Sequence, residues 1–218
     1  MKKVKLTIQK LKEEAKRFSQ IESQYDEPSL FGVTDGKAVG TYLEHKFQKY
    51  LHENYDYVEG SSAKGMDFPG LFVDIKVTSI KQPQSSCPFK SARQKIYGLG
   101  YSLLVFVYDK QDNEENHTGR LNILHTIYVD DSRTGDFQTT SGLIAIIENQ
   151  GNIDDIKAFF EERLLPVDEI QAQELAEEVL KNHPQLGYLT ISNALQWRLQ
   201  YSRVIDVAGT ISGIHRVS

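Results

Sequence analysis

Two aspartates and a lysine lie within one short apolar stretch, MDFPGLFVDIKVT, at residues 66–78. Asp74 and Lys76 stand two positions apart in a run of Val and Ile, and Asp67 precedes a Pro-Gly pair. Because a strand has a period of two, Asp74 and Lys76 share one face. A tight turn at the Pro-Gly pair then brings Asp67 back beside them. The sequence therefore predicts two carboxylates and one ammonium group at a single place.

Such a cluster suits hydrolysis of a phosphodiester by a metal-activated water. Two carboxylates and a strand carbonyl, that of Ile75, are hard oxygen ligands of the kind that Mg²⁺ prefers. The ion offsets charge on the phosphate and lowers the pKa of a bound water. A nearby lysine can orient or help deprotonate that water, or stabilise the transition-state charge. The alternative is a hairpin with a surface ion pair between Lys76 and either aspartate.

This arrangement resembles the PD-(D/E)XK nuclease superfamily, to which many type II restriction endonucleases belong, over roughly residues 38–130. The segment DFPGLFVDIK is especially similar to the corresponding hairpin of the MutH mismatch-repair endonuclease, in its spacing and its Asp-aromatic-Pro start. The resemblance implies that Asp67 and Asp74 bind the metal and that Lys76 assists the nucleophile. The family often has Glu at the position of Asp74, so the side chain here is one carbon shorter.

The superfamily also tends to carry a glutamate on the preceding helix. In GTYLEHKF, residues 40–47, this resemblance makes Glu44 the candidate for the metal site. The alternative is a solvated glutamate paired with a lysine on the helix surface.

The charges are distributed unevenly along a chain whose formal net charge is −5. Residues 75–108 contain no Asp or Glu, and such a local basic surface can attract a polyanion. Gln and Arg can contact base edges, while Lys and Ser commonly meet phosphate. An ordinary polar loop and helix is the alternative. The candidate DNA-contacting residues are Ser61, Ser62, Lys64, Lys81, Gln82, Gln84, Ser85, Ser86, Lys90, Arg93, Gln94, Lys95 and Arg203.

Hydrophobic periodicity predicts the elements that must position these residues. The expected fold class is α/β (α+β), a central mixed sheet flanked by helices with a restriction-endonuclease-like core and a helical C-terminal part. We expect a nuclease domain at 1–165 and, at 166–218, a helical C-terminal extension or subdomain, with the alternative that it is part of the same domain. Expected helices cover 4–20, 38–54, 89–100, 139–149, 152–164, 168–182 and 190–208. Expected strands cover 55–60, 71–78, 101–109 and 121–131, with 81–88 irregular and 109–120 a loop.

The C-terminal stretch from residue 190 allows two interpretations. A short helix, a break and a helix with Arg203 are typical of a helix-turn-helix, whose recognition helix would enter DNA. Alternatively these are core helices, with Leu195, Trp197, Leu199, Val204 and Ile205 packed inside.

Other functional classes find little support in the sequence. The single cysteine, Cys87, allows no internal disulfide, and the six histidines show no zinc-binding spacing. There is neither a phosphate-binding Gly-rich motif nor G-x-S-x-G. The basic start lacks a signal-peptide core, and no apolar run has membrane-spanning length, so we expect a cytoplasmic protein without a membrane partner.

The sequence thus predicts a Mg²⁺-dependent type II restriction endonuclease that acts on double-stranded DNA. A homodimer with two sites would match a palindromic target. The alternatives are a MutH-like monomeric nickase or other DNA repair nuclease, and a non-catalytic helix-turn-helix regulator.

Overall fold

A mixed β-sheet with two helices on one face forms the first of two units into which the chain divides. The computed structural model describes residues 3–60, 65–88, 90–192 and 197–218. Unit 1 comprises residues 1–84, 102–129 and 207–218, and unit 2 comprises 85–101 and 130–206. Each unit is described by itself.

The sheet of unit 1 has the strand order β10-β7-β6-β4, and β2 pairs separately with β7. β4 runs parallel to β6, whereas β7 runs antiparallel to its neighbours β6 and β10. This combination confirms the predicted mixed sheet. The strands are β2 (Asp26–Glu27), β4 (Val73–Ser79), β6 (Ser102–Asn113), β7 (Thr118–Val129) and β10 (Ile214–Arg216). β4 is therefore an edge strand of this sheet. Its side that faces away from β6 is available for hydrogen bonds with the residues that precede β4.

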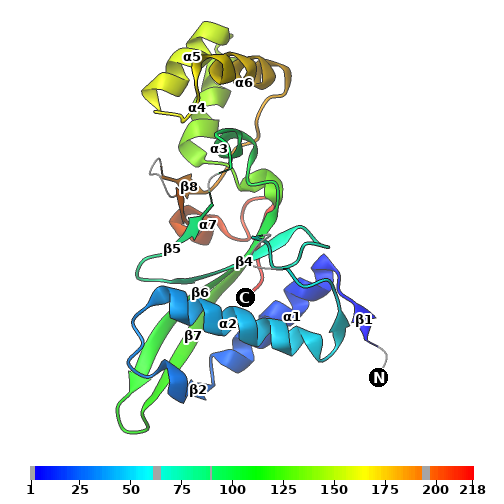
Figure 1. Cartoon of the computed structure of the whole chain (residues 1–218), viewed down its shortest axis with the longest axis vertical. Helices are drawn as coiled ribbons and strands as arrows, with labels where there is room; N and C mark the ends of the chain where they lie inside the picture. Colours follow the sequence, from blue (N-terminus) through cyan, green and yellow to red (C-terminus); the bar gives the residue numbers. More distant parts are fainter. Residues whose placement is uncertain (1–2, 61–64, 89, 193–196) are drawn as a thin grey trace. The chain divides into compact units, whose positions relative to one another are not determined.

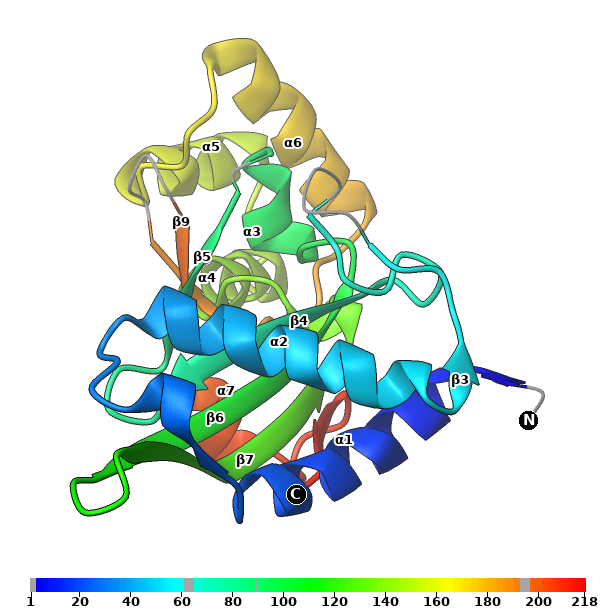
Figure 2. The same ribbon diagram turned by 60° about the horizontal axis from the view of Figure 1, so that its bottom comes forward.

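Two long helices, α1 (Ile8–Glu22) and α2 (Gly36–His52), cover the same face of this sheet (Figures 1 and 2). α2 packs along β4, and α1 packs on β7. The apolar side of α2 is buried in a core whose centre is the aromatic group Phe18, Phe47 and Phe106. The ring centroids of Phe47 and Phe106 are 5.2 Å apart, and those of Phe18 and Phe47 are 5.0 Å apart.

Side-chain caps explain where these helices begin. Thr7 accepts a hydrogen bond from the Lys10 amide at the start of α1, and Asp35 accepts one from the Lys37 amide at the start of α2. The helix predicted for residues 4–20 thus starts later than expected. Its first residues instead form β1 (Val4–Lys5), which pairs in parallel with β3 (Tyr55–Asp56).

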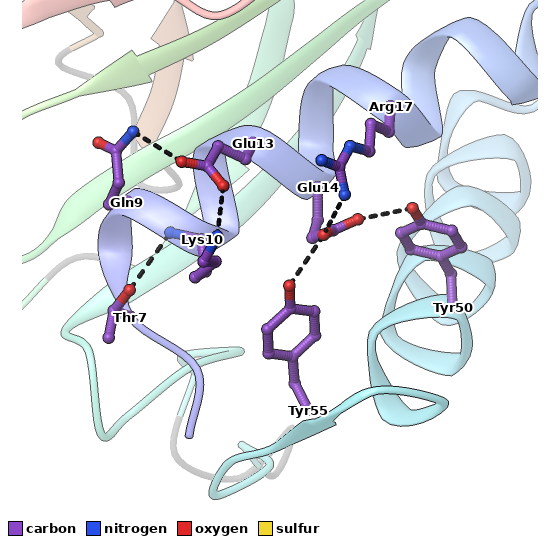
Figure 3. Close-up of polar contacts among 8 residues, drawn as sticks. All are labelled: Thr7, Gln9, Lys10, Glu13, Glu14, Arg17, Tyr50 and Tyr55. Carbon is purple, nitrogen blue, oxygen red and sulfur yellow. Dashed lines mark hydrogen bonds and ion pairs between the residues drawn. The ribbon is translucent and has the colours of Figure 1, made fainter. Parts of the chain in front are cut away.

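A buried carboxylate fastens α1 to α2 and β3 (Figure 3). Glu14 accepts hydrogen bonds from the Tyr50 hydroxyl at 2.7 Å and the Tyr55 hydroxyl at 2.8 Å. Arg17 donates to the same carboxylate at 2.9 Å. Burial, together with the Glu14 carboxylate, raises the pKa of Tyr50 to about 12. Since a buried charge is costly unless it is paired and hydrogen-bonded, this set of donors explains how Glu14 is tolerated inside unit 1.

Unit 2 is built mainly of helices that enclose a separate apolar core. Ile96, Leu143, Phe160 and Val179 are among its buried residues. The helices are α3 (Arg93–Tyr97), α4 (Phe137–Glu148), α5 (Ile153–Glu162), α6 (Glu169–Lys181) and α7 (Ser202–Val207). The strands β5 (Gln84–Cys87), β8 (Thr190–Ile191) and β9 (Trp197–Gln200) form a small sheet in the order β5-β9-β8.

The helix predicted for residues 190–208 is wrong, and so is the helix-turn-helix. β8 and β9 pair antiparallel, and the helix that follows them, α7, covers only Ser202–Val207. Along β9 buried and exposed residues alternate, with a period of two that a strand satisfies. The alternative that this stretch belongs to a core is confirmed for its described residues, because Trp197, Leu199, Val204 and Ile205 are buried. Leu195 lies outside the described residues.

Two further expectations about loops are also wrong. The polar stretch 109–120 continues β6 to Asn113 and begins β7 at Thr118, so only a short turn separates them. Backbone pairing does not require apolar side chains, which is why the charged sequence concealed this extended hairpin. The stretch 81–88, expected to be irregular, contains β5. The strand expected at 55–60 is limited to β3.

No helix in the described parts of the chain combines the length and the apolar character that crossing a membrane requires.

Candidate active site

A tight hairpin brings Asp67 back beside β4, as the sequence predicts. Phe68 and Val73 form an antiparallel bridge, in which the Phe68 amide donates to the Val73 carbonyl at 2.9 Å. Phe72 completes the turn with φ of 54°, an unusual conformation for a bulky residue. The Ile75 amide donates to Asp67 Oδ2 at 2.7 Å. The backbone of β4 therefore holds the Asp67 carboxylate directly.

Asp74 and Lys76 share one face of β4 and form an ion pair. Lys76 Nζ lies 2.7 Å from Asp74 Oδ2, and Asp74 is only 5% exposed. Burial is the largest cause that raises the pKa of Asp67 to about 7, followed by the hydrogen bond and the charge of Asp74. The Ile75 amide opposes this rise by stabilising the ionised form. Two carboxylates and one ammonium group thus meet at the hairpin.

Glu44 joins this group from α2, so the structure places it at the hairpin and not on a solvated helix face. It is half-buried, and burial raises its pKa to about 7. The positive charge of Lys76 lowers the pKa of Glu44, whereas the negative charge of Asp74 raises it. The packing of α2 along β4 is what makes these interactions possible. All four residues predicted to be catalytic therefore lie within one electrostatic cluster.

The donor atoms of this cluster suit Mg²⁺, although no three acidic, histidine or cysteine side chains among the described residues already form a metal cage. Mg²⁺ usually takes only one or two carboxylates and keeps several waters. The amide and carbonyl of one strand residue point to the same side, so the Ile75 carbonyl faces the hairpin, as its amide does. A cation there would offset the repulsion that raises the pKa of Asp67. Asp67, Asp74 and the Ile75 carbonyl therefore fit a divalent ion.

We predict that Glu44→Gln stabilises the protein at pH 8. Because burial raises the pKa of Glu44 from 4.5 to about 7, the folded state binds a proton that the unfolded state has released between these values. Stability linked to Glu44 therefore falls as the pH rises from 4.5 to 7. After allowance for its partial exposure, we expect Glu44→Gln to gain about 1–2 kcal/mol at pH 8.

Denaturant unfolding without divalent metal at pH 4 and pH 8 measures this effect. The gain should be absent at pH 4, where both states of the wild type carry the proton. Glu53→Gln, at the exposed C-terminal end of α2, is the matched control. Equal gains at both pH values would contradict the role of the Glu44 charge.

The residues predicted to contact DNA fall into three groups. Ser61, Ser62 and Lys64 lie outside the described residues. In unit 1, Lys81 and Gln82 are exposed in the turn after β4, and Gln84 is half-buried. Lys81 Nζ lies 3.9 Å from Asp109 Oδ1, and the Lys81 side chain is 78% exposed, so this pair leaves the ammonium group accessible.

Within unit 2 the predicted contact residues differ in accessibility. Ser86 and Lys90 are exposed. Ser85 is hydrogen-bonded to the Tyr201 hydroxyl, Gln94 donates to the Leu99 carbonyl, and the Arg203 guanidinium lies 3.7 Å from the Phe137 ring centroid. Arg93 is held by Glu178 through both carboxylate oxygens. The sequence suggested that these side chains were available to bind DNA, but in the structure they contact other residues of unit 2.

The position of Lys95 differs most clearly from its predicted place on a DNA-contacting surface. It is 3% exposed, and its Nζ lies 5.7 Å from the Trp197 ring centroid inside unit 2. Burial lowers the pKa of Lys95, whereas the charge of Asp136 raises it. The physical reason for the error is that α3 is too short for its periodicity to show which face is buried.

Gln48 is a residue of the cluster that the sequence analysis missed. Its Nε2 donates to Asp67 Oδ1 at 3.2 Å. The sequence did contain a feature that points to Gln48. It lies four residues after Glu44, which places both residues on one face of the predicted helix.

Comparison with known proteins gives one consistent result. The family model described as "Type II restriction enzyme NspV" matches residues 5–216. A curated relative with the same description, from Nostoc sp., is 66% identical over 209 residues, which cover 96% of this chain and 95% of the relative. No solved structure matches the chain.

Proposed function

Because the chain belongs to the family of the type II restriction enzyme NspV, we propose that it cleaves double-stranded DNA at the cluster of Asp67, Asp74, Lys76 and Glu44. Membership makes the chain a sequence-specific restriction endonuclease. The proposal adds the location of the site, the PD-(D/E)XK type of chemistry and the dependence on Mg²⁺.

Each residue of the cluster has a distinct role in this proposal. Asp67, Asp74 and the Ile75 carbonyl would hold Mg²⁺, which when bound offsets phosphate charge and lowers the pKa of a water ligand. Lys76, anchored at 2.7 Å from Asp74, orients the attacking water or stabilises the charge that develops on the phosphate. Glu44, with a pKa of about 7, can accept a proton at its carboxylate near neutral pH.

The observation that carries the proposal is the arrangement of Asp67 and Asp74 on the two arms of one hairpin. The Ile75 amide fixes the first carboxylate, and Lys76 pairs with the second. A carboxylate with a strongly raised pKa, such as Asp67, next to a second carboxylate and a lysine is typical of a functional site. Digestion of unmethylated phage DNA with and without Mg²⁺ tests the function. Discrete fragments that require the ion are expected, and fragments formed equally in EDTA would refute the metal dependence.

We further propose that two copies of the chain act together on a palindromic site. A closed two-fold dimer matches the symmetry of such a target. Sedimentation equilibrium should give about twice the 24.8 kDa of one chain. Supercoiled plasmid with one target should become linear. Accumulation of nicked circles by a monomer would instead favour the MutH-like alternative.

We predict that Lys81 contacts a DNA phosphate. Lys81 is exposed and lies in the turn that directly follows the catalytic strand β4. Lys81→Ala should weaken binding to cognate and unrelated DNA alike and reduce the slope of log K against log salt by about 1. Fluorescence anisotropy in Ca²⁺ at several salt concentrations measures both effects. Lys16→Ala, on the exposed side of α1, is the control, and an unchanged slope for Lys81→Ala would exclude the contact.

A further inference from the structure

Besides its interaction with Asp74, the Asp67 carboxylate accepts one hydrogen bond on each of its oxygens. The Ile75 amide donates to Oδ2 at 2.7 Å, and Gln48 Nε2 donates to Oδ1 at 3.2 Å. A carboxylate has about four lone-pair sites, so these two donors do not use up its capacity to bind a cation. The first donor is backbone and cannot be removed by substitution. Gln48 is therefore the side chain through which the orientation of Asp67 can be changed.

The surroundings of Gln48 hold it in place. It is half-buried on α2, four residues after Glu44 and on the same helix face. The backbone carbonyl of Gln48 accepts a hydrogen bond from the Tyr57 hydroxyl at 3.1 Å, which ties this turn of α2 to the segment after β3. One helix face thus delivers both Glu44 and Gln48 to the hairpin.

A neutral donor is chemically suited to this position. A lysine would bring a second ammonium group that competes with a cation for Asp67, and a glutamate would add a further carboxylate to a crowded set. An amide restrains the carboxylate through a hydrogen bond and leaves its charge for the ion. We propose that Gln48 is a positioning residue, which orients Asp67 for the divalent cation and sets the affinity of the site for it. This inference rests on the proposed function of Asp67.

Gln48→Met tests the inference, because methionine has a similar length and no amide donor. Binding of Mn²⁺, a probe for the divalent site, is measured by isothermal titration calorimetry in the absence of DNA. Partners that orient a metal ligand typically change affinity by 10–100-fold, and we expect about 10-fold weaker binding. The Mg²⁺ concentration for half-maximal cleavage should rise by a similar factor. The rate at saturating Mg²⁺ should recover to within about 3-fold of the wild type, because the reacting groups are unchanged.

Controls separate the possible outcomes. Gln20→Met, on the exposed face of α1, should leave metal affinity unchanged. Unchanged Mn²⁺ affinity in Gln48→Met, or a loss of cleavage that saturating Mg²⁺ does not restore, would overturn the positioning role. Asp67→Asn is measured in parallel. If Asp67→Asn is inactive and Gln48→Met behaves as wild type, only this inference fails. If Asp67→Asn cleaves normally, the proposed site fails with it.

Discussion

Asp74→Ala and Lys76→Ala are each expected to lower the rate of DNA cleavage about 10³-fold at saturating Mg²⁺. Asp74 is buried and supplies one of two carboxylates of the hairpin, so its loss removes a proposed metal ligand and the partner of Lys76. Lys76→Ala removes the cation that we propose to act on the reacting phosphate, and it leaves Asp74 without this ion pair. The two variants therefore weaken the same step through different groups.

Initial rates on a plasmid with one target measure these losses, and gel shifts in Ca²⁺ check that DNA is still bound. Asp56→Ala, an exposed aspartate in β3, is the control and should cleave as the wild type does. Cleavage that survives both hairpin substitutions would show that the site lies elsewhere. Loss of cleavage together with loss of DNA binding would point to a role in binding and not in chemistry.

Phe106→Ala is expected to lower the free energy of unfolding by about 3–5 kcal/mol. Phe106 is fully buried in β6, where its ring lies 5.2 Å from that of Phe47 on α2 and 6.1 Å from that of Phe18 on α1. Its loss removes the ring that both helices share with the sheet and leaves a cavity between them. Since α2 carries Glu44 and Gln48, the same change should also loosen the proposed active site.

Urea unfolding followed by far-UV circular dichroism measures the change in stability. Phe72→Ala provides the same substitution at a residue that is 65% exposed, and we expect it to change stability by no more than about 0.5 kcal/mol. Similar losses for the two variants would contradict the central role of the aromatic core. Restoration of part of the loss by Phe106→Leu would support it, because leucine refills much of the cavity.

The hairpin that carries Asp67, Asp74 and Lys76 could be predicted from the sequence because its determinants are local. A Pro-Gly turn and a strand period of two are sufficient to place Asp67 beside Asp74 and Lys76. The apolar stripe of α2 is long enough for its periodicity to identify a helix with one buried face. In contrast, the stretch 190–208 has short apolar runs, for which periodicity does not separate strands from helices.

Tertiary packing decided which side chains join the cluster and which leave the surface. Gln48 reaches Asp67 only because α2 packs along β4, a contact between residues 19 positions apart. Arg93 is held by Glu178, 85 positions away, and Lys95 is buried by the packing of unit 2. The sequence determined the chemistry of the hairpin, because turn and strand preferences act over a few residues. Long-range packing decided the orientation of its carboxylates and the accessibility of the basic residues, because these depend on distant partners that local patterns do not encode.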